Sequence, residues 1–359
     1  MSKRLRLNAS PRRILLIRLS AFGDVVMASG LIRSLRTLWP EAHLAWLAEE
    51  SLCPLLSAHP ELNALHALPY RRWKTQLKKG HWWRTFLEIK AFRRQLQRES
   101  FDLAIDLQGL MKSGLWAYWS GAPNRLGLGS REGSQWLMSH TLPRDQKDPR
   151  MGKEYRHLAR VLGAPDEAFK PDLPAPESEI QRTLRAEAHH HGKALALFAP
   201  FTTRPQKHWF NDRWVHLAKA LSPHYHCLIL GGPAEQAQAD ALVVAAEGSL
   251  ASLCGKTTLP ECADLIKAAR LLIGVDTGLT HLAMAQGTPT LALFGSTCPY
   301  WEPLHDRALI LYKAEPCSPC HRHPSCGGRF PCMAAHRVED LLDAVAILTR
   351  PRTESPGAS

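Results

Sequence analysis

The segment 271–295 constrains the fold more than any other stretch of the chain. It consists of an apolar run at 271–275, the polar turn Asp276-Thr277-Gly278, a short helical stretch, and a second apolar run after Thr288-Pro289. This order predicts a strand, a turn, a helix and a second strand. Because a strand, helix and strand in succession form a parallel pair, the chain should be an α/β protein that binds ligands at the carboxyl ends of its strands.

The polar turn at 276–278 has the chemistry of an anion site. A helix that begins at Thr277-Gly278 presents free N–H groups and the positive end of its dipole, which suits a phosphate or a diphosphate. Gly278 allows a close backbone approach, and His281 lies about one helical turn further on and points back over the same end. The alternative is that Asp276 or Thr277 caps the helix while His281 packs in the core.

Apolar runs and helical stretches also alternate on both sides of a proline-rich stretch. Prolines at positions 165, 171, 174 and 176 lie close together, which indicates a domain boundary. A chain of 359 residues with 45% hydrophobic content is long enough for two α/β domains. We therefore expect two Rossmann-like, doubly wound domains that face a central cleft. The expected parts are a basic extension at 1–12, domains at 13–175 and 176–350, and a disordered tail at 351–359.

A second strand, turn and helix stand near the N-terminus. The apolar stretch 13–19 is followed by Ser20-Ala21-Phe22-Gly23-Asp24 and by a helix that should extend to about Trp39. The turn holds one glycine and lacks the GxGxxG pattern, which argues against a nicotinamide cofactor. Asp24 is placed at the carboxyl edge of the sheet, where it is either a helix cap or a general base facing the cleft.

The net charge of +12 implies a polyanionic partner: nucleic acid, an anionic membrane surface or an acidic substrate. Most of the excess lies between Arg71 and Arg98, where aromatic residues are interleaved with cations and Glu88 is the single acidic residue. A basic amphipathic helix with aromatic residues suits a membrane interface or a phosphorylated ligand, and a merely solvated surface is the alternative. The ten cations are Arg71, Arg72, Lys74, Lys78, Lys79, Arg84, Lys90, Arg93, Arg94 and Arg98.

Membrane-spanning and secretory segments are not expected. The sequence contains no apolar run of the length that a membrane span requires. The apolar stretch after Arg13 is interrupted by Arg18 and by Gly23-Asp24, which argues against a signal peptide. The sequence therefore predicts a cytoplasmic protein.

Four of the nine cysteines cluster near the C-terminus. The spacing of Cys317, Cys320, Cys326 and Cys332 is compatible with a structural zinc or iron site, or with reduced thiols that pack a loop. The other five lie in or near apolar segments and are expected in the core: Cys53, Cys227, Cys254, Cys262 and Cys298.

Four motifs occur in the order found in the bacterial heptosyltransferases, which form glycosyltransferase family 9, and the resemblance extends from Arg13 to Leu348. The segment Arg71-Arg72-Trp73-Lys74 resembles heptosyltransferase I in particular, whereas the four-cysteine loop is more similar to the second heptosyltransferase and to some protein-modifying relatives. The four motifs are the 13–30 segment with Gly23-Asp24, Asp106-Leu107-Gln108-Gly109-Leu110-Met111-Lys112-Ser113, Thr202-Thr203-Arg204 with Lys207-His208-Trp209, and Asp276-Thr277-Gly278-Leu279-Thr280-His281-Leu282.

The resemblance implies a GT-B fold with the acceptor on the amino-terminal domain and the nucleotide sugar on the carboxyl-terminal one. It implies inverting transfer of L-glycero-D-manno-heptose from ADP-heptose to the Kdo region of the lipopolysaccharide inner core, with no catalytic metal or other cofactor. Asp24 would be the general base. The donor site would comprise Thr202, Thr203 and Lys207 at the diphosphate, with Asp276, Thr277, Gly278 and His281, and Glu235 at the ribose.

Kdo-lipid A carries carboxylates and phosphates, so Arg71, Arg72 and Lys112 are the candidates for binding the acceptor, and peripheral association with the anionic inner membrane is expected. One alternative is a family 9 relative that acts on another core position or on a protein. Another is a nucleic-acid-binding protein, but the motifs at the strand ends point to a small-ligand cleft, so no nucleic-acid partner is expected.

Overall fold

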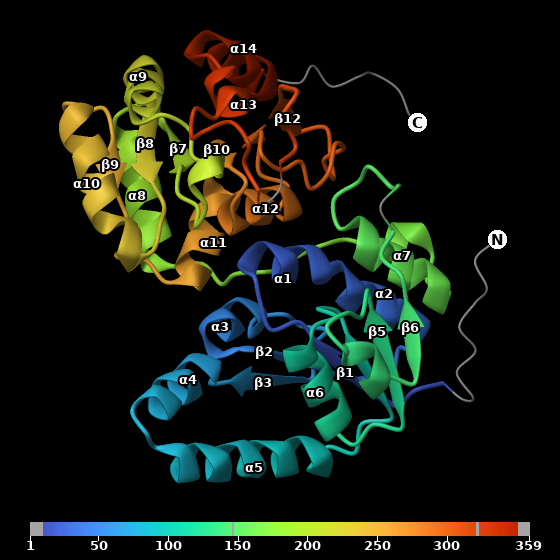
Figure 1. Ribbon diagram of the computed structural model, residues 1–359. Coiled ribbons are helices and arrows are strands. Elements are labelled where there is room, and N and C mark those ends of the chain that lie inside the picture. Colours follow the sequence, from blue (N-terminus) through green and yellow to red (C-terminus); the bar gives the residue numbers. More distant parts are fainter. Residues whose placement is uncertain (1–9, 146, 321–322, 351–359) are drawn as a thin grey trace. The chain divides into compact units, whose positions relative to one another are not determined.

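The computed structural model describes residues 10–145, 147–320 and 323–350 (Figure 1). The chain divides into unit 1, Met1–Pro174, and unit 2, Ala175–Ser359, and each unit has its own sheet. The tail predicted at 351–359 lies outside the described residues, as does most of the extension predicted at 1–12. Among the described residues, no helix is both long and apolar enough to cross a bilayer.

Unit 1 is built on a six-stranded parallel sheet in the order β3-β2-β1-β4-β5-β6. Its strands are β1 (Arg13–Ile17), β2 (His43–Glu49), β3 (Ala64–Leu68), β4 (Leu103–Asp106), β5 (Asn124–Leu128) and β6 (His140–Leu142). Its α-helices are α1 (Phe22–Ala28), α2 (Gly30–Leu38), α3 (Cys53–Leu56), α4 (Tyr70–Lys78), α5 (Trp82–Arg98), α6 (Met111–Trp119) and α7 (Lys153–Leu162).

Unit 2 is built on a second six-stranded parallel sheet in the order β12-β11-β10-β7-β8-β9. Its strands are β7 (Ala194–Ala199), β8 (Tyr225–Ile229), β9 (Ala251–Ser252), β10 (Leu271–Val275), β11 (Thr290–Phe294) and β12 (Ala308–Tyr312). Its α-helices are α8 (Glu179–His190), α9 (Asn211–Leu221), α10 (Gln236–Ala245), α11 (Leu259–Ala268), α12 (Gly278–Ala285), α13 (Pro331–Ala334) and α14 (Val338–Thr349).

The two sheets have the same topology. In each, the first strand of the unit pairs with the second on one side and with the fourth on the other, so the strand order reverses between β1 and β4 and between β7 and β10. This is the Rossmann strand order, and ligands bind such sheets in the crevice at the carboxyl ends of the two central strands. The predicted α/β, doubly wound architecture is confirmed.

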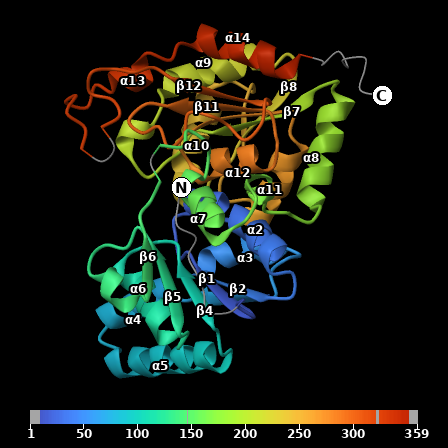
Figure 2. The same cartoon turned by 90° about the vertical axis from the view of Figure 1, so that its right-hand side faces the viewer.

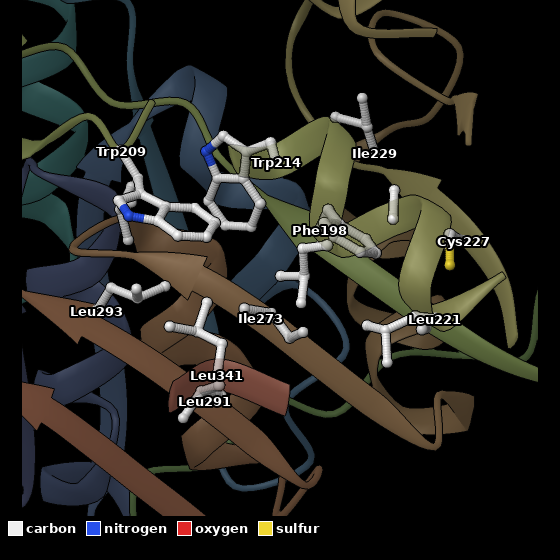
Figure 3. Packing of buried hydrophobic residues seen from close by; sticks show 14 of the residues in the cluster. Phe198, Trp209, Trp214, Leu221, Cys227, Ile229, Ile273, Leu291, Leu293 and Leu341 are labelled. Atoms are coloured by element: carbon white, nitrogen blue, oxygen red, sulfur yellow. The ribbon is translucent and has the colours of Figure 1, made fainter. Parts of the chain in front are cut away.

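The central strands are apolar except at Arg13, the first residue of β1, and Asp106, the last residue of β4, because helices cover both faces of the sheet. All five residues of β10 are buried. Figure 2 shows α9 and α14 on one face of the unit 2 sheet and α11 and α12 on the other. On the α9 face, Trp214 packs edge-to-face on Trp209 and Phe198 with ring centroids 4.9 and 5.7 Å apart (Figure 3). Truncating such a buried aromatic typically costs about 3–5 kcal/mol, so this cluster fixes the core of unit 2.

Two helical segments differ from their sequence-based prediction. The helix expected to extend to Trp39 is interrupted at Ser29, whose hydroxyl donates to the Val26 carbonyl at 2.7 Å and accepts from the Asp172 N–H at 2.9 Å. The basic segment 71–98 forms two helices, α4 and α5, because the chain turns at Gly80 with a positive φ of 81°. A residue in this conformation ends a helix, and glycine adopts it without strain.

Candidate functional site

The switch point of unit 1 holds a salt bridge between Arg18 and Asp24. Arg18 directly follows β1 and is buried, and its guanidinium pairs with the Asp24 carboxylate and donates to the Leu107 carbonyl at 3.0 Å. Burial acts to lower the pKa of Arg18, but neighbours that include Asp24 raise it above its ordinary value, so the guanidinium stays charged. The Asp24 side chain remains 34% exposed, which leaves the carboxylate open to a ligand.

Asp24 also serves its own helix. It is the third residue of α1, and its carboxylate accepts from the Ala21 N–H at 3.3 Å. This contact satisfies one of the free donors at the helix start. Asp24 is therefore not the N-cap residue, which is Ala21, and its hydrogen bond to the N-cap N–H coexists with an accessible carboxylate at the edge of the sheet.

The end of β4 adds a tight loop beside this salt bridge. Asp106 is fully buried and accepts from the N–H groups of Gln108 and Gly109 at 3.0 and 3.1 Å, while the Gln108 side chain accepts from the Leu19 N–H at 3.1 Å. Burial raises the pKa of Asp106. Gly109 has a φ of +69°, and a Cβ there would lie 2.6 Å from the carbonyl oxygen of Leu128, so the loop requires glycine.

The predicted acceptor cations lie near one another at the start of α4 and α6. The Lys112 ammonium is 3.8 Å from the Glu49 carboxylate at the end of β2 and 5.3 Å from the centre of the Tyr70 ring. Tyr70 is the first residue of α4, and Arg71 and Arg72 follow it. Arg72 pairs with Glu88 at 3.3 Å, and no ion pair involves Arg71 within the described residues.

The switch point of unit 2 holds a buried cluster centred on Asp276. One carboxylate oxygen accepts from the Lys207 ammonium at 2.6 Å and from the Thr297 hydroxyl, and the other accepts from His281 Nε2 at 3.0 Å. His281 Nδ1 lies 2.7 Å from the Tyr300 hydroxyl. The structure thus brings together three of the predicted donor residues: Lys207 from the loop after β7, Asp276 from the end of β10, and His281 from α12.

The cluster keeps its aspartate charged. Burial acts to raise the pKa of Asp276, but the hydrogen bond and charge of His281, with the charge of Lys207, lower it well below its ordinary value. Burial raises the pKa of Tyr300 well above its usual range, so the phenol stays protonated. Such a fully partnered carboxylate fixes the position of the ammonium and imidazole groups that face it.

Beside the cluster, the first turn of α12 carries an open set of backbone donors. Thr277 is the N-cap residue, its side chain makes no capping hydrogen bond, and Gly278 begins the helix. Thr277 and Gly278 are only partly buried. The N–H groups of this turn can therefore bind an anion next to the Lys207 ammonium.

Three predicted donor residues lie outside the Asp276 cluster. Thr202 is partly buried, and its backbone carbonyl accepts from His208 at 2.7 Å, while Thr203 is exposed in the same loop. Glu235 follows β8, the strand next to β7, and its carboxylate accepts from the Gly232 N–H at 2.8 Å. These residues occupy the same edge of the sheet as the cluster, and the contacts found for Glu235 are those of a turn cap.

A comparison with protein families assigns the chain to one of them. The model of glycosyltransferase family 9, described as the heptosyltransferase family, matches residues 89–328, well over half of the chain. The chain belongs to glycosyltransferase family 9. The resemblance inferred from the four motifs is thereby confirmed, and the protein is a glycosyltransferase.

Individual relatives agree with this family. Lipopolysaccharide heptosyltransferase 1 of Pseudomonas aeruginosa is 29% identical over 317 residues, which are 86% of this chain and 86% of that one. The family 9 glycosyltransferase of Veillonella parvula has a TM-score of 0.81 and 20% identity over 97% of this chain and 99% of its own. The structure of Escherichia coli ADP-heptose lipopolysaccharide heptosyltransferase II has a TM-score of 0.73 and 22% identity, and the match covers 94% of this chain and 98% of that one. These structures confirm the predicted GT-B fold.

Several polar residues of this glycosyltransferase were not predicted. Thr297 follows β11, the strand next to β10, so the rule that placed Asp276 at a strand end also applies to it. Tyr300 lies three residues further on and carried no comparable signal. Arg18 was noted as an interruption of an apolar strand, and its pairing with Asp24 was not foreseen.

The four clustered cysteines lie in one loop and in the short helix α13 that follows it. Cys332 is 4% exposed in the core of unit 2, whereas Cys317, Cys320 and Cys326 lie partly exposed in the preceding loop. Across the part of the chain that the structure describes, no group of three or more His, Cys, Asp or Glu side chains is arranged to hold a metal ion. Of the five cysteines expected in the core, four are buried, and Cys298 is the exception at intermediate exposure.

Proposed function

We propose that this family 9 glycosyltransferase transfers L-glycero-D-manno-heptose from ADP-heptose to the Kdo region of the lipopolysaccharide inner core, with inversion at the anomeric carbon. The observation that carries the proposal is the Lys207–Asp276–His281 cluster beside the open first turn of α12. Support for the substrates comes from the relatives, since one is a lipopolysaccharide heptosyltransferase 1 and another is an ADP-heptose lipopolysaccharide heptosyltransferase.

In this proposal the Asp276 cluster and the start of α12 bind the donor diphosphate. The leaving ADP gains negative charge as its bond to the sugar breaks, and the Lys207 ammonium and the N–H groups after Thr277 stabilise that charge. Thr202 and Thr203 would add hydroxyl donors from the loop after β7, and Glu235 would accept from the ribose hydroxyls. Fixed cations and amides of this kind perform the role that a bound metal ion has in other glycosyltransferases.

Asp24 is the proposed general base. As the acceptor hydroxyl oxygen forms its bond to the anomeric carbon, the bond from that carbon to the diphosphate breaks and the hydroxyl proton passes to the Asp24 carboxylate. The buried Arg18 holds the carboxylate in place while a third of its surface stays open. Attack opposite the leaving group accounts for inversion. Asp24 belongs to unit 1, and the proposed donor residues belong to unit 2.

The acceptor would be bound through its acidic groups. Kdo carries a carboxylate and lipid A carries phosphates, and Lys112, Arg71 and Arg72 offer cations near the ends of β2 and β4. Because such an acceptor is anchored in a bilayer, the enzyme would work as a cytoplasmic, peripheral protein at the anionic inner-membrane surface.

The test is a transfer assay with two acceptors, read by mass spectrometry. Purified protein is incubated with ADP-heptose and either Kdo2-lipid A or the same acceptor already carrying one heptose. Heptose added to the first acceptor alone supports the proposal. Heptose added only to the second moves the reaction one position along the core, as in the second heptosyltransferase. Transfer to neither refutes the substrate assignment, and acceptor competition with a protein substrate would then test a protein-modifying activity.

A further inference from the structure

The outer surface of α4 and α5 carries a group of exposed apolar side chains, which we name the aromatic ridge. Its members are Leu77, Trp82, Trp83, Phe86 and Leu87, with exposed fractions of 41, 70, 72, 54 and 47%. Trp83 and Phe86 stack with ring centroids 5.8 Å apart. Single exposed apolar residues are common in soluble proteins, but four on two successive turns of one helix, two of them stacked, mark a surface that contacts another body.

The ridge lies on a helix that is firmly packed by its opposite side. Thr85 and Leu96 of α5 are buried, and Phe92 packs edge-to-face on Trp73 and Trp116 with ring centroids 5.8 and 5.2 Å apart. Figures 1 and 2 both show α5 on the outer side of α4 and α6 within unit 1. Helix α5 therefore packs on unit 1 through other side chains, and the exposed aromatic side chains are additional to them.

Cations flank the ridge, and most of them lack an ionic partner. Glu88, the only acidic residue between Arg71 and Arg98, is already bonded by Trp73 at 2.9 Å and by Gln76 and Arg84 at 3.2 Å. In the described chain no ion pair involves Lys78, Lys79, Lys90, Arg93 or Arg94. Lys78 and Lys79 lie between Leu77 and Trp82, and Arg93 and Arg94 lie two helical turns beyond Phe86 and Leu87 on the same helix side.

We propose that the aromatic ridge and its flanking cations form a membrane-docking surface, in which the aromatics enter the interface of an anionic bilayer and the cations bind lipid phosphates. This inference rests on the proposed function insofar as a lipid-anchored acceptor requires the enzyme at a membrane. Tryptophan and phenylalanine favour the headgroup region, and lysine and arginine beside them add attraction to anionic lipids.

The charge and chemistry of the surface favour a bilayer over other occupants. A second copy of the chain would bring its own ridge cations against these, and like charges repel. Nucleic acid would satisfy the cations, but the aliphatic side chains of Leu77 and Leu87 would remain in water, since bases stack on aromatic rings and phosphates bind cations. An anionic bilayer buries the apolar side chains and pairs the cations at once.

The ridge is also connected to the proposed acceptor site. Helix α4 starts at Tyr70, whose ring lies against the Lys112 ammonium, and it ends at Lys78 beside the ridge. Arg71 and Arg72 lie on the first turn of the same helix. Docking through the ridge would therefore place the bilayer that anchors the acceptor about two helical turns from the cations proposed to bind it.

The experiment is vesicle flotation of the full-length protein at low and physiological salt. Vesicles contain phosphatidylethanolamine with phosphatidylglycerol, and vesicles of phosphatidylcholine alone serve as the neutral comparison. We expect partitioning onto the anionic vesicles only, weakened by salt. The Lys78→Gln/Lys79→Gln/Lys90→Gln variant should partition more weakly by roughly fivefold for each cation removed. The Trp82→Ala/Trp83→Ala/Phe86→Ala variant should lose at least roughly tenfold.

Matched variants carry the same changes elsewhere on the surface. Trp136→Ala/Trp301→Ala removes two other exposed tryptophans, with exposed fractions of 83 and 53%, and Arg182→Gln/Arg185→Gln/Lys267→Gln removes three other exposed cations. Both should partition like the parent protein. Circular dichroism and ADP binding confirm that every variant is folded, and turnover of a deacylated, water-soluble acceptor should be unchanged in the ridge variants.

Several results would overturn the docking surface. Equal binding to neutral and anionic vesicles, or equal losses in the ridge variants and in their matched controls, would do so. A parent protein that is dimeric by light scattering and becomes monomeric in the ridge aromatic variant would assign the ridge to self-association. An RNA gel shift abolished by the same variant would assign it to nucleic acid.

Vesicle binding without heptose transfer to any acceptor would refute the proposed function and leave the docking surface standing.

Discussion

Replacing Lys207 with methionine separates the structural and the ligand-binding roles of the donor cluster. The Lys207 side chain is 17% exposed, and its ammonium donates to Asp276 at 2.6 Å. Methionine retains most of the aliphatic stem and removes the charge, so among the described residues Asp276 keeps His281 and Thr297 as donors. Loss of one hydrogen bond to a charged group costs about 1.5–3 kcal/mol, and we expect the free energy of unfolding of unit 2 to fall by that amount.

The same substitution should weaken binding of ADP. If the Lys207 ammonium contacts the diphosphate, the loss of one charge-assisted hydrogen bond raises the Kd for ADP by roughly 10- to 150-fold. Isothermal titration measures this change at a temperature where circular dichroism shows both proteins folded. Adenosine, which lacks phosphate, should bind both proteins equally, and Lys207→Arg should recover part of the affinity for ADP.

Lys219→Met is the matched control. Lys219 lies in the same unit and pairs with Glu247 at 3.0 Å, and both side chains are well exposed. Neither residue belongs to the segments that directly follow β7 and β10. This surface pair is worth at most about 1 kcal/mol, and ADP affinity should not change. A Lys207→Met protein that loses stability and yet binds ADP like the parent would refute the diphosphate role and leave Lys207 as a partner of Asp276 alone. A variant unchanged in both respects would refute both roles.

Three further predictions concern other parts of the chain. Asp24→Asn should lower turnover by roughly 10²–10⁴-fold and leave the Kd for ADP in a titration unchanged, and a parallel loss of ADP binding would contradict its role as the base. Gly109→Ala should lower the melting temperature more than Gly192→Ala: both positions have positive φ, but a Cβ at 109 meets carbonyl oxygens at 2.6 Å and one at 192 meets nothing within 4 Å. The folded-state pKa of Asp276 is lowered, so its stabilising effect is complete above its unfolded pKa, near 4, and is lost as the pH falls further. The parent protein should therefore lose more stability in acid than Asp276→Asn, as thermal unfolding at several pH values would show.

The sequence was sufficient to predict the fold because apolar strands alternate with helical stretches along the chain. The strand at 271–275 was predicted with the bounds that the structure shows, and the turn and helix after it were predicted in order. The short edge strands β6 and β9 have three and two residues, too few to show a hydrophobic pattern. Strand order and register come from packing between distant segments, and single-sequence patterns do not contain that information.

Candidate residues were predictable where polar side chains directly follow a strand. Asp276 met this condition, His281 lies about one helical turn further on, and the structure places both in one cluster with Lys207. Arg18 did not stand out because a single cation inside an apolar run resembles an interruption, and its carboxylate partner becomes visible only when the turn after β1 is folded. The cysteine spacing left a metal site and a set of reduced thiols as alternatives, and the structure places Cys332 in α13 against the core and the other three cysteines in the loop before it.

The two aspartates at the two switch points have environments that suit opposite roles. Asp276 is buried, and its two oxygens accept from Lys207, His281 and Thr297, so the described contacts occupy three of its four lone-pair positions. The Asp24 side chain is a third exposed, and Arg18 is the one cation paired with it among the described residues, so a substrate hydroxyl can reach the carboxylate. The surroundings of each carboxylate therefore determine whether it holds cations in place or can act as a base. This contrast is the physical reason for assigning proton transfer to unit 1 and diphosphate binding to unit 2.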